Sequence, residues 1–290
     1  MITATLYSDP ACPWAYSESP ALRVIEWRYG DQLDWKLVLI GLTESSEQYA
    51  RRGYTPVRGA LGQLLFRNRY GMPFAPEPKA RLSATARACR AVVAARLQNP
   101  GSEWAVFRAL QLANFTGPLV LEDDDMLRDA LRDIPGVDAE AIVAALDSAE
   151  VTEAYQADKV DTRTAAGSAA ELQGKTATTD GPVRFTAPSI VFQSNGTSLV
   201  AGGFQPVEAY DILVTNLDPT LTRQSPPETP EPLLAAFPGG LTTQEVAALM
   251  TEGNDAPDRG AAEAALIELV AAGKASRRSL GDDALWQPAA

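Results

Sequence analysis

The feature that most constrains this chain is Cys12, which stands between an apolar run at residues 3 to 8 and the start of a helical pattern. The run is typical of a strand, and apolar residues at helical spacing continue to Tyr29, where Gly30 ends the helix. A second apolar run at residues 35 to 40 predicts another strand. The three elements form a βαβ unit, with Cys12 at the turn that leads from the first strand into the helix.

The sequence around Cys12 favours a reactive thiol that has no second cysteine in the same turn. Unpaired backbone N–H groups and the positive end of a helix dipole stabilise a thiolate, so we expect Cys12 to be accessible and charged. Position 15 is alanine, so no thiol one helical turn along can resolve a mixed disulfide formed at Cys12. An external thiol or another residue must complete such a reaction. The alternative is a buried structural cysteine.

Composition excludes several classes of site. None of the 290 residues is histidine, which excludes Ser-His-Asp triads, Cys-His pairs and histidine-ligated zinc. Only two cysteines are present, as is typical of a reducing compartment, and they are too far apart in the sequence to suggest a thiolate metal site. Because neither an export signal nor a membrane span is visible, we expect a cytoplasmic protein of two units.

Charge is distributed unevenly along the chain. The net charge of −12 disfavours general nucleic-acid binding, yet residues 51 to 90 carry nine basic groups against the single acid Glu77. The segment is therefore locally +8. It is either a solvated surface that balances acidic helices elsewhere or a docking face for an anionic thiol or an acidic substrate.

Beyond the first unit the pattern is helical and then returns to strands. Residues 43 to 176 predict a helical insertion, including an alanine-rich helix at 83 to 97 and acidic helices near 123 to 133 and 138 to 158. Two short apolar runs flank Asn195-Gly196, which is a strong hairpin signal. Pro206 then suits the first turn of a final helix.

Several motifs together resemble the DsbA-like thioredoxin-fold family: Asp9-Pro10-Ala11-Cys12-Pro13-Trp14, Ala187-Pro188 before a strand, and Gly203-Phe204-Gln205-Pro206. The resemblance covers about residues 1 to 216 and includes FrnE-type oxidoreductases, 2-hydroxychromene-2-carboxylate isomerases and kappa glutathione transferases. It implies an α/β thioredoxin-like fold, formed by residues 1–42 and 177–216 and interrupted by the helical insertion at 43–176.

The resemblance also implies a set of site residues. Cys12 is the catalytic nucleophile, while Pro13, Trp14, Ala187 and Pro188 frame the substrate, with Pro188 matching the family's cis-proline. FrnE-type members have Cys-Pro-Trp-Cys, whereas the isomerase and kappa transferase branch has a serine in the first position and activates a bound glutathione thiol. This chain lies between the two patterns.

The remaining candidates have structural alternatives. Cys89 is expected to be a core residue of its helix, or else a remote resolving thiol. Trp14 either forms an apolar wall beside the thiolate or belongs to the core. Asp9 is expected to be a helix cap or a turn residue, because a carboxylate this close to a thiolate opposes its ionisation.

The C-terminal segment is predicted to form a separate unit. Six prolines within residues 217–240 suit a semi-rigid linker. Residues 241–290 then show a capping box at Thr242 and Glu245, a second helix at 257 to 272 and a hairpin, which together resemble a winged helix. Eight acids against four bases oppose DNA contact there, so a packing or protein-interaction role is preferred.

The resulting expectation is a cytoplasmic thiol-disulfide oxidoreductase in which Cys12 attacks a disulfide or a small thiol conjugate. No tightly bound cofactor and no metal are expected, and glutathione or mycothiol would resolve the adduct. Two alternatives stay open: a thiol-dependent isomerase or transferase in which Cys12 stabilises a bound thiolate, and a non-catalytic binding module. Membrane association is not expected, nucleic acid is disfavoured, and a homodimer is compatible with the sequence.

Overall fold

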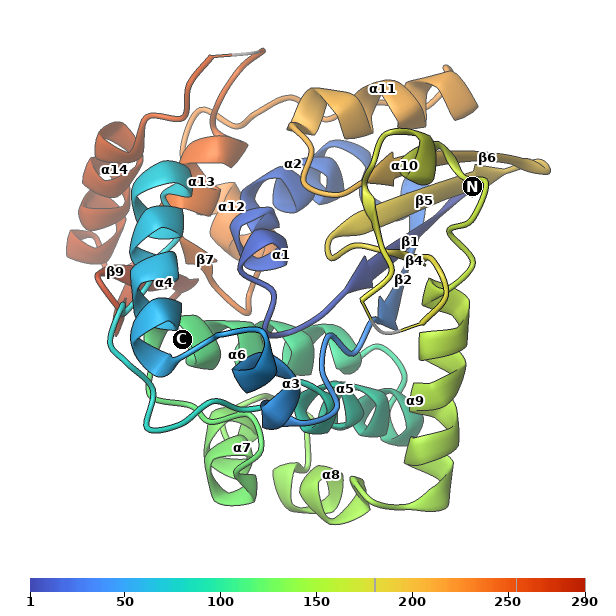
Figure 1. Ribbon diagram of the computed structural model, residues 1–290. Coiled ribbons are helices and arrows are strands. Elements are labelled where there is room, and N and C mark those ends of the chain that lie inside the picture. The colour runs from blue at the N-terminus through green and yellow to red at the C-terminus, as the bar shows by residue number, and fades with distance from the viewer. Residues whose placement is uncertain (180, 254, 290) are drawn as a thin grey trace.

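The computed structural model describes residues 1–179, 181–253 and 255–289 and has a central four-stranded mixed sheet (Figure 1). The strands are β1 (Ile2–Ser8), β2 (Leu33–Leu39), β5 (Ser189–Ser194) and β6 (Thr197–Gly202), in the order β2-β1-β5-β6. β1 is parallel to β2 and antiparallel to β5, so the N-terminal unit and the late hairpin share one sheet. The hairpin turn has Asn195 and Gly196 at positive φ, as the sequence predicts.

The first helical stretch is split in two. α1 (Pro13–Ser17) and α2 (Ser19–Tyr29) are separated at Glu18, and Pro20 lies in the first turn of α2. Proline has no N–H to donate to the preceding turn, so the helix is interrupted just before it. Cys12 is the N-cap of α1, and Gly30 ends α2 with φ at +49°.

A helical segment joins β2 to the late hairpin, as predicted. It buries the alanine-rich face of α5 against the sheet, and Tyr155 of α9 belongs to the same core. Figure 1 shows α5 and α9 on one side of the sheet and α2 and α11 on the other. The acidic stretch predicted as one helix near 138 to 158 is two helices, because Ser148 caps a new one. The segment contains α3 (Ser46–Arg51), α4 (Pro56–Tyr70), α5 (Ala86–Gln98), α6 (Glu103–Thr116), α7 (Asp124–Leu131), α8 (Ala139–Ala145), α9 (Ala149–Thr162), α10 (Ala169–Leu172), β3 (Thr176–Ala177) and β4 (Arg184–Phe185).

The chain after β6 forms α11 (Val207–Leu217) and then a C-terminal group of elements. The prolines predicted as a linker enclose a short helix, α12 (Glu231–Ala236), whose Leu233 and Leu234 are buried. The predicted order of helix, helix and hairpin follows, with the capping box of Thr242 and Glu245 in place. Its elements are β7 (Leu241–Thr242), α13 (Thr243–Leu249), α14 (Arg259–Ala271), β8 (Ala275–Leu280) and β9 (Asp283–Pro288), and the sheet order is β7-β9-β8.

The C-terminal group packs against the rest of the chain. Its apolar cluster includes Val24 of α2. Beside it, buried Glu245 of α13 pairs with Arg108 of α6 at 2.8 Å. These contacts join the C-terminal elements to both the βαβ unit and the helical segment.

Candidate active site

The Cys12 side chain lies against the loop that precedes β5. Its Sγ atom donates a hydrogen bond to the carbonyl oxygen of Ala187 at 3.2 Å, although 175 positions separate the two residues. The Ala187–Pro188 peptide bond is cis, and Pro188 is buried. The structure therefore brings together Cys12, Ala187 and Pro188, three of the residues singled out in the sequence.

Burial changes the expected state of this thiol. Cys12 is only 5% exposed and packs in an apolar cluster with Tyr7, Phe185 and Ala187. Desolvation raises its pKa to about 12, although the backbone N–H groups of Ala15 and Trp14 act in the opposite direction. The expectation of an accessible, charged Cys12 is wrong for this structure, because the cost of desolvation exceeds the stabilisation at the helix start. The resting thiol is protonated at neutral pH.

Asp9 is a buried acceptor next to the thiol. Its carboxylate accepts hydrogen bonds from the backbone N–H of Ala11 and Leu42, both at 2.9 Å, and from the Thr85 hydroxyl at 2.8 Å. Burial raises the pKa of Asp9, and its negative charge adds to the raised pKa of Cys12. Asp9 is a turn residue, as the sequence predicts, and it also ties the Cys12 turn to the loop after β2 and to the start of α5.

Cys89 contacts the same Asp9 carboxylate. It is fully buried in α5, its Sγ lies 3.5 Å from Asp9 Oδ2, and burial raises its thiol pKa well above the usual value. Both cysteines are free thiols. The expectation that Cys89 is a core residue is confirmed, and the role of a resolving thiol has no disulfide to support it.

An aromatic group borders the site on the solvent side. Trp14 is 44% exposed, and its ring makes edge contacts with Phe66 at 4.8 Å, Phe204 at 5.8 Å and Tyr70 at 5.9 Å between centroids. Pro13, which precedes Trp14, is half-buried at the start of α1. Trp14 therefore forms an exposed apolar wall rather than a core residue. Phe66 and Tyr70 of α4 are site residues that the sequence pattern did not single out, and Phe204 after β6 was named only as part of a family motif.

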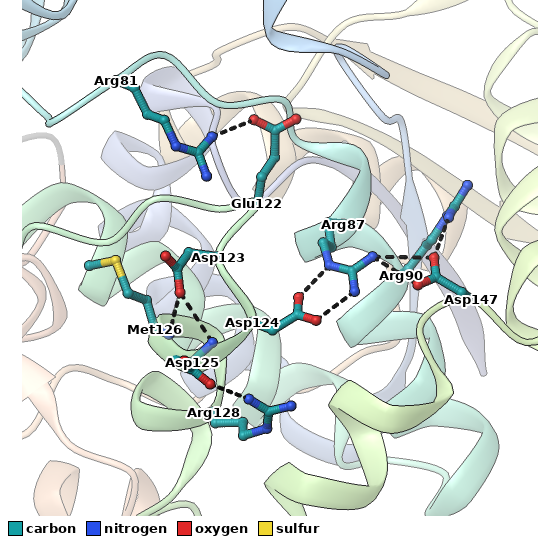
Figure 2. A network of polar contacts seen from close by, with 10 residues as sticks. All are labelled: Arg81, Arg87, Arg90, Glu122, Asp123, Asp124, Asp125, Met126, Arg128 and Asp147. Atoms are coloured by element: carbon teal, nitrogen blue, oxygen red, sulfur yellow. Dashed lines mark hydrogen bonds and ion pairs between the residues drawn. The ribbon is translucent and has the colours of Figure 1, made fainter.

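The basic segment at 51 to 90 divides into two parts in the structure. Figure 2 shows Arg81, Arg87 and Arg90 paired with Glu122, Asp124 and Asp147, which lie at the start of α7 or in the turns before α7 and α9. This half balances acidic helices. In the other half, Arg51, Arg52, Arg58 and Arg69 make no ion pair within the described part of the chain.

Across residues 1–179, 181–253 and 255–289, no group of three or more histidine, cysteine, aspartate or glutamate side chains could hold a metal ion. No helix in those ranges is both long enough and apolar enough to cross a bilayer.

Comparison with known proteins decides the family. The model of the DSBA-like thioredoxin domain matches residues 3–174, more than half of the chain. The chain belongs to this family. The family is one of thioredoxin-fold oxidoreductases, and the α/β fold with a helical insertion implied by the motifs is confirmed. A search of curated proteins found no significant match.

Solved structures similar to this DSBA-like protein share its fold at low sequence identity. The cytosolic disulfide reductase DsbM of Pseudomonas aeruginosa is 21% identical with a TM-score of 0.51, over 74% of this chain and 98% of its own. A candidate protein disulfide isomerase of Nitrosomonas europaea is 20% identical with a TM-score of 0.56, over 74% and 96%. A probable DsbA oxidoreductase of Streptomyces coelicolor is 18% identical with a TM-score of 0.56, over 78% and 93%.

Proposed function

We propose that this DSBA-like protein is a thiol-disulfide oxidoreductase that works through Cys12 alone and uses a low-molecular-weight thiol to resolve the adduct. The observation that carries the proposal is the 3.2 Å contact between Cys12 Sγ and Ala187 O beside the cis-proline. It puts the single thiol of the turn next to a buried loop and an exposed aromatic wall, where a disulfide can be held. A reducing compartment, which two free cysteines favour, would supply the resolving thiol.

The reaction needs three exchanges. In the first, the Cys12 sulfur forms a bond to one sulfur of the substrate, the substrate disulfide breaks, and the departing sulfur takes up the proton that Cys12 loses. In the second, an external thiol attacks the Cys12 sulfur of the mixed disulfide, the bond to the substrate breaks, and the substrate sulfur leaves as a thiol. In the third, another external thiol attacks the sulfur now attached to Cys12, forms the external disulfide, and returns Cys12 to its protonated thiol. With two equivalents of external thiol the substrate is reduced and the external thiol is oxidised to its own disulfide.

Because the Cys12 thiol is buried, it must be deprotonated as the substrate binds before the first exchange can occur. Only a small thiolate fraction exists at neutral pH when the pKa is about 12. Substrate entry between Trp14 and the Ala187 loop would release Cys12 from its bond to the Ala187 carbonyl. The N–H groups of Trp14 and Ala15, which already lower the thiol pKa, would then stabilise the charge as it develops.

The test is turnover of glutathione disulfide and of a small mixed disulfide with the external thiol in excess. Cys12→Ser is expected to abolish exchange, and Cys89→Ala is expected to retain it. Ala15→Cys is the matched gain of function. Ala15 is buried and its side chain is only one atom smaller than that of cysteine. The variant is therefore expected to form a disulfide between positions 12 and 15 and to need less external thiol. Full exchange by Cys12→Ser would overturn the proposal.

A second function is favoured by the hydrogen bond that the Cys12 thiol donates to the Ala187 carbonyl, together with the raised pKa of that thiol. A thiol that stays protonated is a hydrogen-bond donor, and it could stabilise the thiolate of a bound cosubstrate in an isomerase or transferase reaction. Under that mechanism Cys12→Ser would keep much of the activity, because a hydroxyl donates the same hydrogen bond. The two functions therefore predict opposite results for one variant.

A further inference from the structure

We propose that one face of α4 docks an acidic, partly apolar segment of a polypeptide substrate and delivers its disulfide to Cys12. The inference rests on the proposed function and deepens it, because it assigns a substrate class to the site. The docking face is defined by Val57, Leu61 and Leu65, with Arg58 and Arg69 beside them.

The apolar part of the docking face is exposed over three turns. Val57 is 57% exposed, Leu61 is 59% exposed and Leu65 is 71% exposed, and they follow one another at intervals of four residues. Such a row forms a ridge on a helix surface. Scattered exposed leucines need no explanation, but an aligned row on one helix is typical of an interaction site.

The positive charge around this ridge favours an acidic partner. Residues 48 to 76 contain five arginines and no acid, although the whole chain has a net charge of −12. Arg58 and Arg69 lie in α4, and Arg51 and Arg52 lie at the end of the preceding helix α3; none of these four makes an ion pair among the described residues. A partner that complements both features is apolar on one side and acidic on its flanks.

Two glycines of α4 support close approach by another chain. Gly59 and Gly62 lie inside the helix, where glycine costs about 1 kcal/mol relative to alanine. An added Cβ at either position would meet nothing within 4 Å, so the fold itself does not require glycine there. By helical periodicity Gly62 lies between the apolar ridge and the side that carries Phe66 and Tyr70, and Gly59 lies on that side.

The docking face meets the candidate active site at the C-terminal end of α4. Arg69 is next in the four-residue row, and its guanidinium lies 5.4 Å from the centroid of the Tyr70 ring. Tyr70 in turn makes an edge contact with the Trp14 ring at 5.9 Å between centroids. Arg69 also lines a cleft of about 660 Å³ with Arg67, Arg259 and Asp282, where the Asp282 carboxylate pairs with Arg67 at 3.5 Å. The row from Val57 to Arg69 is about 18 Å long at 1.5 Å per residue, which suits a polypeptide better than a small thiol.

A second copy of the chain is a poorer occupant. In a symmetric dimer the same patch meets itself, so the unpaired arginines of both copies would face each other. Like charges placed opposite one another across an interface are unfavourable.

The test measures docking without any sulfur chemistry. Two fluorescent peptides, about four helical turns long, carry the same leucines and a serine in place of cysteine; one has glutamates and the other lysines at the flanks. Anisotropy titrations with the full-length protein are expected to show binding of the glutamate peptide alone, weakened at high salt. Leu61→Ser with Leu65→Ser, or Arg58→Glu, should weaken binding about tenfold or more. Ile267→Ser, at 53% exposure on α14, is the control and should bind like the wild type.

Each result has a defined meaning. Turnover of glutathione disulfide should stay normal in the α4 variants, which shows that the fold and Cys12 are intact. Equal binding of both peptides, or unchanged binding by the double variant, would overturn the docking proposal while leaving the proposed function standing. A wild-type dimer that Leu65→Ser converts to a monomer would also overturn it, because a second copy would then cover the face. If the wild type turned over no disulfide at all, the proposed function would be contradicted, but the peptide titrations would be unaffected.

Discussion

The thiol of Cys12 and the carbonyl oxygen of Ala187 are joined by a hydrogen bond of 3.2 Å. The same contact that places the thiol beside the cis-proline loop also removes it from water, since both residues are less than 10% exposed. In the resting state the contact that positions the Cys12 thiol for reaction therefore also lowers its reactivity.

The first prediction concerns the reaction of Cys12 with iodoacetamide as a function of pH, measured in a Cys89→Ala background. Burial raises the thiol pKa to about 12, so alkylation of the folded protein near pH 8 should be about a thousandfold slower than that of a free cysteine. The same protein unfolded in urea is the control and should titrate near the free value of about 8.5. An inflection below pH 8 in the folded protein would show that the thiol is already activated.

A second prediction concerns Asp9. In Asp9→Asn an amide N–H₂ must replace one of two oxygens that both accept hydrogen bonds, so a donor such as the Leu42 N–H loses its acceptor. We expect the free energy of unfolding in urea to fall by about 1–3 kcal/mol. Loss of the negative charge should also lower the pKa of Cys12, visible as faster alkylation. Slower alkylation than in the wild type would contradict the assigned effect of Asp9.

Glu18 gives a third prediction, on stability against pH. Burial raises its carboxyl pKa to about 8, above the unfolded value of 4.5, so the folded state holds a proton that the unfolded state releases. This group's stabilising contribution is fully present below pH 4.5 and declines as the pH rises toward 8. Glu18→Gln should therefore be more stable than the wild type at pH 7, by about 1–3 kcal/mol, with a flatter profile between these pH values. A variant less stable than the wild type at pH 7 would contradict the raised pKa.

Glu245 should show the opposite dependence. Burial acts to raise its pKa, but the charge and hydrogen bonds of Arg108 outweigh this and leave the pKa at about 2, below the unfolded value of 4.5. Stability from this group is present above pH 4.5 and is lost as the pH falls toward 2. Glu245→Gln should cost about 3–5 kcal/mol at pH 7, because it leaves Arg108 buried without its ionic partner.

The matched control for Glu245 is the exposed pair of Lys274 and Glu231, at 2.8 Å with both side chains about half exposed. Glu231→Gln should cost no more than about 1 kcal/mol, since solvent screens the pair. Equal costs for the two glutamates in urea unfolding would show that the Arg108 pair does not hold the C-terminal elements in place.

Local signals in the sequence predict much of this fold. Asn195-Gly196 specifies a hairpin because both residues adopt positive φ without strain, and Thr242 with Glu245 specifies a helix start because each satisfies the other's backbone N–H. These features depend on neighbours a few positions away. The family motifs likewise predict that Cys12 and Pro188 meet.

The features that the sequence did not predict depend on contacts between residues that are distant in the sequence. The raised pKa of Cys12 arises from a cluster that includes Phe185 and Ala187, and no local pattern reports that burial. The division of the basic segment depends on which arginines reach Asp124 and Asp147. Phe66 and Tyr70 are site residues because the fold brings α4 beside Trp14, which no local sequence pattern predicts.

The central claim is that Cys12 is the sulfur that reacts with a disulfide. The most direct test is intact-protein and peptide mass spectrometry after exposure of the folded wild type, Cys12→Ser and Cys89→Ala to glutathione disulfide. We predict one glutathione per chain, attached at Cys12, in the wild type and in Cys89→Ala, and none in Cys12→Ser. An adduct at Cys89, or a wild type that takes up no glutathione however long the exposure, would contradict the account.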